Sequence, residues 1–191
     1  MPKLIDDSQV FTVVIQIFMR YGYEGTKMED VAAAADINKV SLFRKYDSKL
    51  NLIALALNQL FSERSFLQVT YTGDLEADLT TIVQTYLENS HGYEALVPIL
   101  MVEIPRHPEL VPLLDFPMDN LVHVAQLILR YQHEGLLAPG PFWQHLSVLL
   151  GPLMTGQLFR HGNPNLPQPN LDLSAYVSHF LDGRRGNNNR A

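Results

Sequence analysis

The chain has 191 residues and no cysteine, which excludes disulfide scaffolds, cysteine-ligated metal sites and thiol catalysis. Its 47% hydrophobic and 18% charged residues are typical of a globular protein and exclude an intrinsically disordered chain. The net charge of −6 argues against a nucleic-acid partner for the chain as a whole, but residues 1–50 carry seven basic and seven acidic side chains, so the acidic excess lies entirely after them.

The first helix is predicted between Val10 and Tyr21, where apolar residues recur at i, i+3, i+4, i+7, i+8 and i+11. Ser8 or Asp7 can cap this helix, and Gly22 is expected to end it.

The chain turns acidic before any long apolar run, and no apolar stretch is long enough to span a bilayer. We therefore expect a soluble, cytoplasmic protein with no membrane partner.

Two short helices follow. Thr26 and Glu29 fit a capping box at the start of the first, and Asn38 can cap the second, which runs to Tyr46. A tight turn at Asp36 separates them, so the pair is a candidate helix-turn-helix.

That motif needs a small residue where its helices cross, a turn that tolerates positive φ, and an apolar anchor after the turn. Ala32 or Ala33 suits the crossing, Asp36 suits the turn, and Ile37 suits the anchor. Residues 38–49 also carry four cations and one anion, a basic cluster on an otherwise acidic chain.

Further helices are predicted over 49–61, 74–88, 93–103, 108–134, 142–160 and 171–181, separated by turn signals rich in glycine and proline. Pro112 and Pro117 imply a late start or a kink in the segment 108–134. No segment alternates apolar and polar residues as a strand does. The predicted fold is therefore all-α, with about nine helices.

Residues 22–49 read GYEGTKMEDVAAAADINKVSLFRKYDSK. This stretch resembles the DNA-binding domain of TetR-type (tetracycline-repressor-like) transcriptional regulators, whose pattern is roughly G-Y-x-x-T, four residues to I-A, then A-G-V-S-x-G-T-L-Y-x-Y-F-x-S-K. The resemblance covers about the first fifty residues. It implies a three-helix DNA-binding domain at 1–48 and a larger helical domain for effector binding and dimerisation at 49–183. We expect residues 184–191 to form a disordered tail.

The resemblance also implies which residues contact DNA. They are Thr26, Lys27, Asn38, Lys39, Val40, Ser41, Phe43, Arg44, Lys45 and Lys49. Thr26 and Lys49 match phosphate contacts, and a helix N-terminus suits an anion. Lys39 can donate to guanine O6 or N7, and Val40 can pack on a thymine methyl group. Three residues depart from the family pattern: Asp36 and Val40 replace glycines, and Phe43 replaces a tyrosine.

Bulky residues of the larger region can surround an effector pocket, although ordinary core is the better interpretation of each one alone. The candidates are Tyr86, Met101, Ile104, Leu121, Ile128 and Leu149. Glu88, Glu103 or Asp119 can meet a cationic effector. The family builds its dimer interface from the last two long helices, and the first of these has an apolar stripe comprising Leu146, Leu149, Leu150, Leu153, Met154 and Leu158.

We predict a homodimer that binds double-stranded operator DNA of pseudopalindromic sequence, as a repressor more readily than an activator, and that responds to a small-molecule effector of unknown identity. We expect no enzymatic activity, cofactor or metal site, since no two of the seven histidines lie at i, i+4. One alternative is an all-α small-molecule binding protein or enzyme whose N-terminal bundle is structural. Another is a DNA-binding member of the family without an effector.

Overall fold

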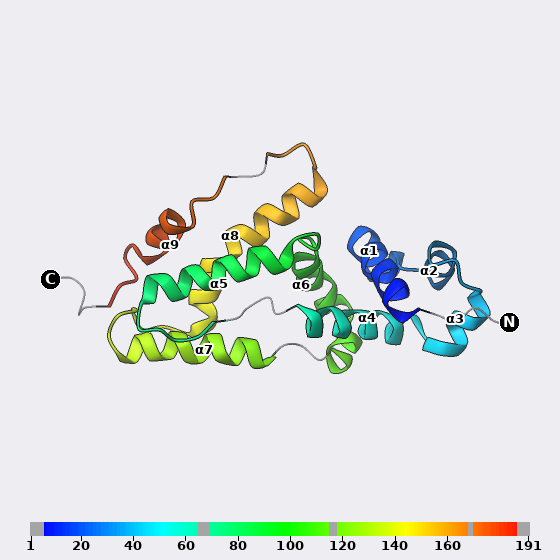
Figure 1. Cartoon of the computed structure of the whole chain (residues 1–191), viewed down its shortest axis with the longest axis horizontal. Helices are drawn as coiled ribbons and strands as arrows, with labels where there is room; N and C mark the ends of the chain where they lie inside the picture. Colours follow the sequence, from blue (N-terminus) through cyan, green and yellow to red (C-terminus); the bar gives the residue numbers. More distant parts are fainter. Residues whose placement is uncertain (1–5, 65–68, 115–117, 168–169, 187–191) are drawn as a thin grey trace. The chain divides into compact units, whose positions relative to one another are not determined.

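The computed structural model describes residues 6–64, 69–114, 118–167 and 170–186. These ranges hold nine α-helices and one 3₁₀ helix, and their single β-bridge joins Leu137 to Arg185, so the fold is all-α as predicted (Figure 1). No helix within them has both the length and the apolar character needed to cross a membrane.

The chain divides into two compact units. Among the described residues, the first unit comprises 6–64 and 95–114, and the second comprises 69–94, 118–167 and 170–186. This division differs from the predicted functional domains at 1–48 and 49–183, because residues 49–64 and 95–114 pack with the N-terminal helices. The functional assignment of the domains stays a prediction.

The first unit contains five α-helices and the 3₁₀ helix. They are α1 (Asp7–Gly25), α2 (Met28–Ala34), α3 (Lys39–Tyr46), α4 (Lys49–Glu63), α6 (Leu96–Arg106) and η1 (Pro108–Leu113). Helix α1 packs against α2, α4 and α6. Its stripe of Val10, Val14 and Phe18 is fully buried, whereas Tyr21 at the predicted end of the stripe is 56% exposed.

The N-terminal end of α1 differs from the prediction, whereas the end of its regular part at Gly22 agrees with it. Asp6, rather than Asp7 or Ser8, caps the helix by accepting hydrogen bonds from the N–H groups of Ser8 and Gln9. Gly22 leaves the helical conformation with φ of +69°, as expected of the residue that ends the regular helix. A short further turn then extends the element to Gly25.

The second unit contains four α-helices, α5 (Leu75–Ser90), α7 (Met118–His133), α8 (Phe142–Gly162) and α9 (Leu173–Leu181). The single helix predicted over 108–134 is in fact two, η1 and α7. The prolines of this segment explain the break, since a proline interrupts a helix unless it lies in the first turn. Ordered structure also extends beyond the predicted start of the tail at residue 184, because Ala138 N–H donates to Arg184 O and Gly186 N–H donates to Leu136 O. Residues 187–191 lie outside the described residues.

Helix α8 is apolar on two faces. The predicted stripe mostly turns inward: Leu149, Leu150 and Leu153 are buried in the core of the second unit, and Leu146 and Met154 pack against that core. Leu158 alone of the stripe is well exposed. The outward apolar residues are Trp143, Val148, Leu158 and Phe159, which we call the outer face of α8.

Candidate nucleic-acid interface

The helix-turn-helix has the geometry that its residues predict. Asp36 adopts φ of +53° in the turn, and Ile37 N–H donates to Ala32 O at 2.9 Å. Ala32 is 4% exposed at the helix crossing, whereas Ala33 is exposed. Asn38 caps α3 by accepting from Val40 N–H at 2.9 Å. These contacts hold the two short helices at a defined angle.

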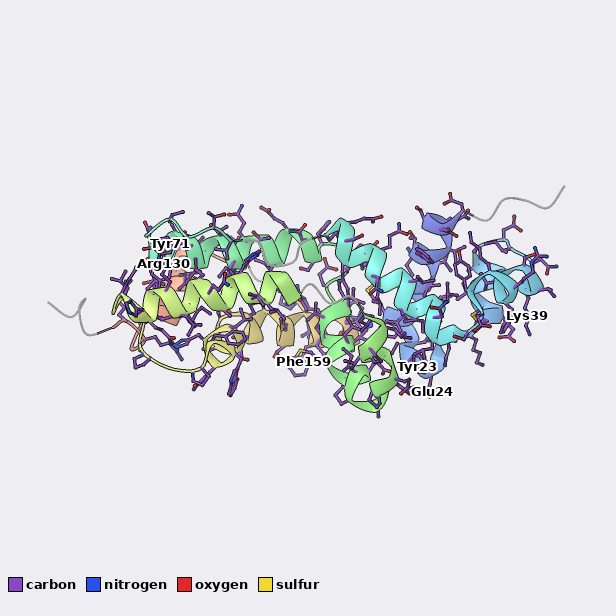
Figure 2. The ribbon with its side chains drawn as sticks, turned by 90° about the horizontal axis from the view of Figure 1, so that it is seen from below. Tyr23, Glu24, Lys39, Tyr71, Arg130 and Phe159 are labelled. Atoms are coloured by element: carbon purple, nitrogen blue, oxygen red, sulfur yellow. The ribbon has the colours of Figure 1, made fainter. Side chains whose placement is uncertain are left out.

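Helix α3 has one face in the core and one in solvent. Leu42 and Tyr46 are 0% and 3% exposed, while Val40 is 74% exposed. Lys39, Phe43 and Arg44 are also exposed, and Lys39 is labelled in Figure 2. A protruding valine among cations is unusual on a purely solvated helix, and the N-terminal half of a recognition helix is the part that reaches base edges.

An ion pair joins the two helices of the motif. Lys39 Nζ lies 2.5 Å from Glu29 Oε1, and both side chains are more than half exposed. The hydrogen bond from Lys39 lowers the pKa of Glu29, so this carboxylate is ionised at neutral pH. The predicted capping role of Glu29 is wrong, because the N-cap of α2 is Lys27 and Thr26 does not cap it.

A second polar cluster ties α1 to α3. The carboxylate of Asp7 accepts hydrogen bonds from Lys45 Nζ and from the hydroxyl of Tyr46. These two donors, Lys45 first, lower the pKa of Asp7, and burial together with the Asp7 carboxylate raises the pKa of Tyr46. Lys45 is thus paired within the protein, at the C-terminal end of the recognition helix.

The Asp7 cluster predicts a pH-dependent contribution to stability. A carboxylate whose pKa is lowered on folding stabilises the folded state above its unfolded pKa, and this contribution disappears as the pH falls through the folded value. Asp7→Asn should therefore lower the free energy of unfolding by less than about 1 kcal/mol at neutral pH, as for other exposed ion pairs. The difference from wild type should shrink as the pH falls below the ordinary aspartate pKa of 3.8 and disappear below the lowered pKa of the folded state.

Urea unfolding of both proteins at several pH values between 7 and 3 measures this difference. Lys45→Met removes the ammonium that pairs with Asp7, so it should likewise reduce the loss of unfolding free energy as the pH falls. An Asp7→Asn curve that stays parallel to wild type throughout would contradict the prediction.

Two predicted phosphate contacts are engaged inside the protein. Thr26 is 2% exposed; its hydroxyl donates to Gly22 O at 2.7 Å, and its N–H is shared between Gly22 O and Tyr23 O. Lys49 Nζ donates to Tyr23 O at 2.9 Å and lies 4.1 Å from the Tyr23 ring centroid. In this conformation the hydroxyl and the N–H of Thr26 are both used within the protein, and the Lys49 ammonium is held against Tyr23. Both hold the segment that leads into α2.

Glu103 of α6 and His107, the residue that follows this helix, complete this arrangement, and local sequence patterns could not have found them. Tyr23 N–H donates to Glu103 Oε2 at 3.0 Å, across 80 residues of sequence, and the His107 ring lies 4.2 Å from the Tyr23 ring. Figure 2 shows Tyr23 beside Glu24. Glycine is favoured at position 22 by its φ of +69°, and a Cβ there would lie 2.9 Å from Glu103 Oε1 and displace this carboxylate. Glu103 thus supports the segment that leads into the motif.

The predicted interface residues therefore fall into three groups. Lys27, Asn38, Lys39, Val40, Phe43 and Arg44 are exposed, Ser41 is half-buried beside them, and Thr26, Lys45 and Lys49 are bonded within the protein. The sequence patterns suggested capping roles for Asp7 and Glu29 and an effector contact for Glu103. They missed that these carboxylates pair with Lys45, with Lys39 and with the Tyr23 N–H, respectively.

Comparison with known proteins agrees with this geometry. Residues 14–56, which contain the whole helix-turn-helix, match the family model described as "Bacterial regulatory proteins, tetR family". This N-terminal part of the chain is a DNA-binding domain of the TetR family of transcriptional regulators.

Similarity to known regulators extends over more of the chain. The chain is 24% identical over 178 residues to Rv1556 of Mycobacterium tuberculosis, an uncharacterised HTH-type transcriptional regulator, covering 92% of this chain and 85% of the relative. It is 30% identical over 101 residues to the DNA-binding transcriptional repressor TetR of Mycobacteroides abscessus, covering 52% of this chain and 50% of that protein.

Solved structures share the fold. A TetR family transcriptional regulator from Pseudomonas syringae pv. tomato matches with a TM-score of 0.64 at 18% identity, covering 95% of this chain and 98% of the other. The flavonoid-responsive regulator FrrA matches with a TM-score of 0.60 at 21% identity, covering 97% and 98%. At these identities the likeness establishes a common fold.

The candidate effector residues of this TetR-family chain are divided between the two compact units. Tyr86, Ile128 and Leu149 are each 1% exposed in the core of the second unit. Leu121 is half-buried on α7, whereas Met101 and Ile104 lie on α6 of the first unit, with Met101 62% exposed.

Tyr86 has a structural role that accounts for its position. Its hydroxyl donates to Gln157 Oε1 at 2.5 Å, and Gln157 Nε2 donates to Ser90 Oγ at 3.2 Å. Burial raises the pKa of Tyr86, so the phenol stays protonated. A buried polar chain whose members satisfy one another stabilises a core. Tyr86 is therefore explained as core.

Proposed function

We propose that this TetR-family regulator is a ligand-responsive repressor that binds a pseudopalindromic operator as a homodimer. The observation that carries the proposal is the division of α3 into a buried side, with Leu42 and Tyr46, and a solvent side that presents Lys39, Val40 and Arg44. A helix of this kind can enter the major groove while its buried side remains packed.

The proposed contacts follow from exposure. Lys39 and Val40 lie at the start of α3, where they can reach a guanine edge and a thymine methyl group. Lys27 and Arg44 supply cations for phosphates, whose neutralisation releases counterions and provides much of the affinity. Lys45 can join them only by leaving Asp7. Thr26 and Lys49 act by holding the segment before α2 in place.

The outer face of α8 supports the dimer. Trp143 and Phe159 are 60% and 64% exposed, and Val148 and Leu158 are 38% and 39% exposed on the same helix. Four large apolar side chains exposed on one helix are a sign of an interaction surface. We propose that a second copy of the chain covers them around a two-fold axis, with α9 beside α8, so that two recognition helices meet one operator.

Ligand responsiveness is proposed for the second unit. A surface groove of about 390 Å³ lies there between α7 and the segment before α5, and its lining mixes apolar with polar groups: Val69, Thr70, Tyr71, His123, Gln126, Leu127 and Arg130. An effector that favours one arrangement of the dimer would shift the population of DNA-binding states. The names of FrrA, a flavonoid-responsive regulator, and of the M. abscessus repressor are consistent with these roles.

Selection of bound duplexes from a random double-stranded DNA library tests the proposal. The full chain should enrich two inverted half-sites whose centres lie about 10–10.5 base pairs, or a multiple, apart. The enriched site placed across a promoter should lower expression of a reporter when the protein is present. Failure to enrich any sequence at about 0.15 M salt, where weak non-specific binding is suppressed, would reject the proposed function.

A further inference from the structure

The ion pair between Glu29 and Lys39 places an acceptor beside a donor at the surface proposed to meet DNA. Lys39 is the first residue of α3, and Glu29 lies in the first turn of α2. Their charged atoms are 2.5 Å apart, with side chains 53% and 55% exposed. The carboxylate is therefore not remote from the recognition helix: it lies at the same end of α3 as the exposed Val40.

The backbone around the pair is held firmly. The hydrogen bond from Ile37 to Ala32 closes the turn, and Asn38 caps α3. The Lys39 ammonium also lies 5.7 Å from the centroid of the Phe43 ring, a favourable position for a cation. Glu29 and Lys39 therefore start from a preorganised arrangement when the motif approaches a duplex.

A carboxylate at this surface is unfavourable on most DNA, because phosphates repel it and its hydration is lost in the groove. The lost hydration is offset only where a base offers a hydrogen-bond donor to the carboxylate. In the major groove those donors are cytosine N4 and adenine N6. A lysine has the opposite requirement, for which guanine presents two acceptors, O6 and N7.

Resting on the function proposed above, we propose that Glu29 is a specificity-determining residue that reads a G·C base pair together with Lys39. Lys39 donates to guanine O6 or N7, and Glu29 accepts from cytosine N4. In the same register an A·T pair presents adenine N6, a donor, to the lysine and thymine O4, an acceptor, to the carboxylate. The lysine loses the O6 acceptor but can still donate to adenine N7, whereas the carboxylate faces an acceptor, so it is Glu29 that rejects A·T.

The same ion pair suppresses non-specific binding. Glu29 neutralises Lys39 on sequences that do not suit the pair, so one cation fewer is available to phosphates. Glu29→Gln frees that cation, and the slope of log Kobs against log salt on random DNA should steepen by about 0.9. Affinity for random DNA should rise several-fold at about 0.15 M salt.

The test compares the full-length wild type, Glu29→Gln and a matched control, Asp30→Asn. Asp30 is the next residue of α2 and lies beside the groove lined by Arg20 and Lys27, so its change removes an equal charge from another part of the helix. Each protein is used for selection from a random duplex library, followed by titration on the wild-type consensus and on random DNA at three salt concentrations.

Glu29→Gln should relax a G·C preference at one position of each half-site and reduce discrimination against A·T there by about tenfold. Asp30→Asn should leave the preference at every position as in wild type. Unchanged preferences and salt slope in Glu29→Gln, or relaxation at an adenine position, would overturn the inference while wild-type enrichment upholds the proposed function. If wild type enriches no site, the proposed function itself fails.

Discussion

Lys39→Ala and Arg44→Ala should each weaken operator binding by about tenfold at about 0.15 M salt, and by about a hundredfold in combination. Both residues are exposed on α3, while the side chains that hold α3 in the core, Leu42 and Tyr46, remain unchanged. Loss of Lys39 removes the proposed donor to guanine and leaves Glu29 without its cation. Loss of Arg44 removes a phosphate contact.

The two variants should differ in how their loss of affinity depends on the DNA sequence. Lys39→Ala should reduce affinity for the operator more than for random DNA, because it changes base reading. Arg44→Ala should weaken binding on all sequences alike and reduce the salt slope by about one. Gel shifts at several salt concentrations separate these outcomes, and circular dichroism verifies the fold.

Arg106→Ala provides a matched control, since Arg106 is an exposed arginine of the first unit that lies on α6 outside the helix-turn-helix. It should bind the operator as wild type does. If Lys39→Ala and Arg44→Ala also bind as wild type under these conditions, α3 is not the recognition helix.

Phe159→Glu should convert the proposed dimer to a monomer and lower operator affinity by more than about a hundredfold. Phe159 is 64% exposed within a single chain, so the substitution leaves the core of the second unit intact. At a two-fold interface the same residue is changed on both subunits, and two desolvated carboxylates are then buried close together. A monomer binds one half-site and loses the gain in effective concentration from the second.

Sedimentation velocity at micromolar concentration measures the assembly, and a gel shift measures operator affinity. The control is Leu129→Glu, which places the same charge at a 55% exposed leucine of α7 in the same unit. That variant should remain dimeric. A dimeric Phe159→Glu protein would place the interface elsewhere on the chain.

The local elements follow closely from short-range sequence patterns. Asn38 and Ser48 cap the predicted helices, Asp36 adopts the positive φ expected of the turn, and Gly22 ends the regular part of α1. Each of these features depends on groups within a few residues of one another, so the pattern of the chain is sufficient to predict them.

The orientation of α8 shows that the spacing of apolar residues does not always predict which face of a helix is buried. A helix that is apolar all round has no single stripe to mark its inner face. The leucines first assigned to the subunit interface turn toward the core of the second unit, while Trp143 and Phe159 face outward. Only the packing of α5, α7 and α9 around α8 distinguishes the two faces.

The sequence alone determined that the chain is all-α and that it carries a helix-turn-helix near its N-terminus. Tertiary structure alone decided which charged groups of the motif are available. It pairs Lys39 with Glu29, Lys45 with Asp7 and the Tyr23 N–H with Glu103. The physical reason is distance along the chain: helix caps and amphipathic faces arise from neighbours, whereas an ion pair between residues 38 apart exists only after the helices have packed.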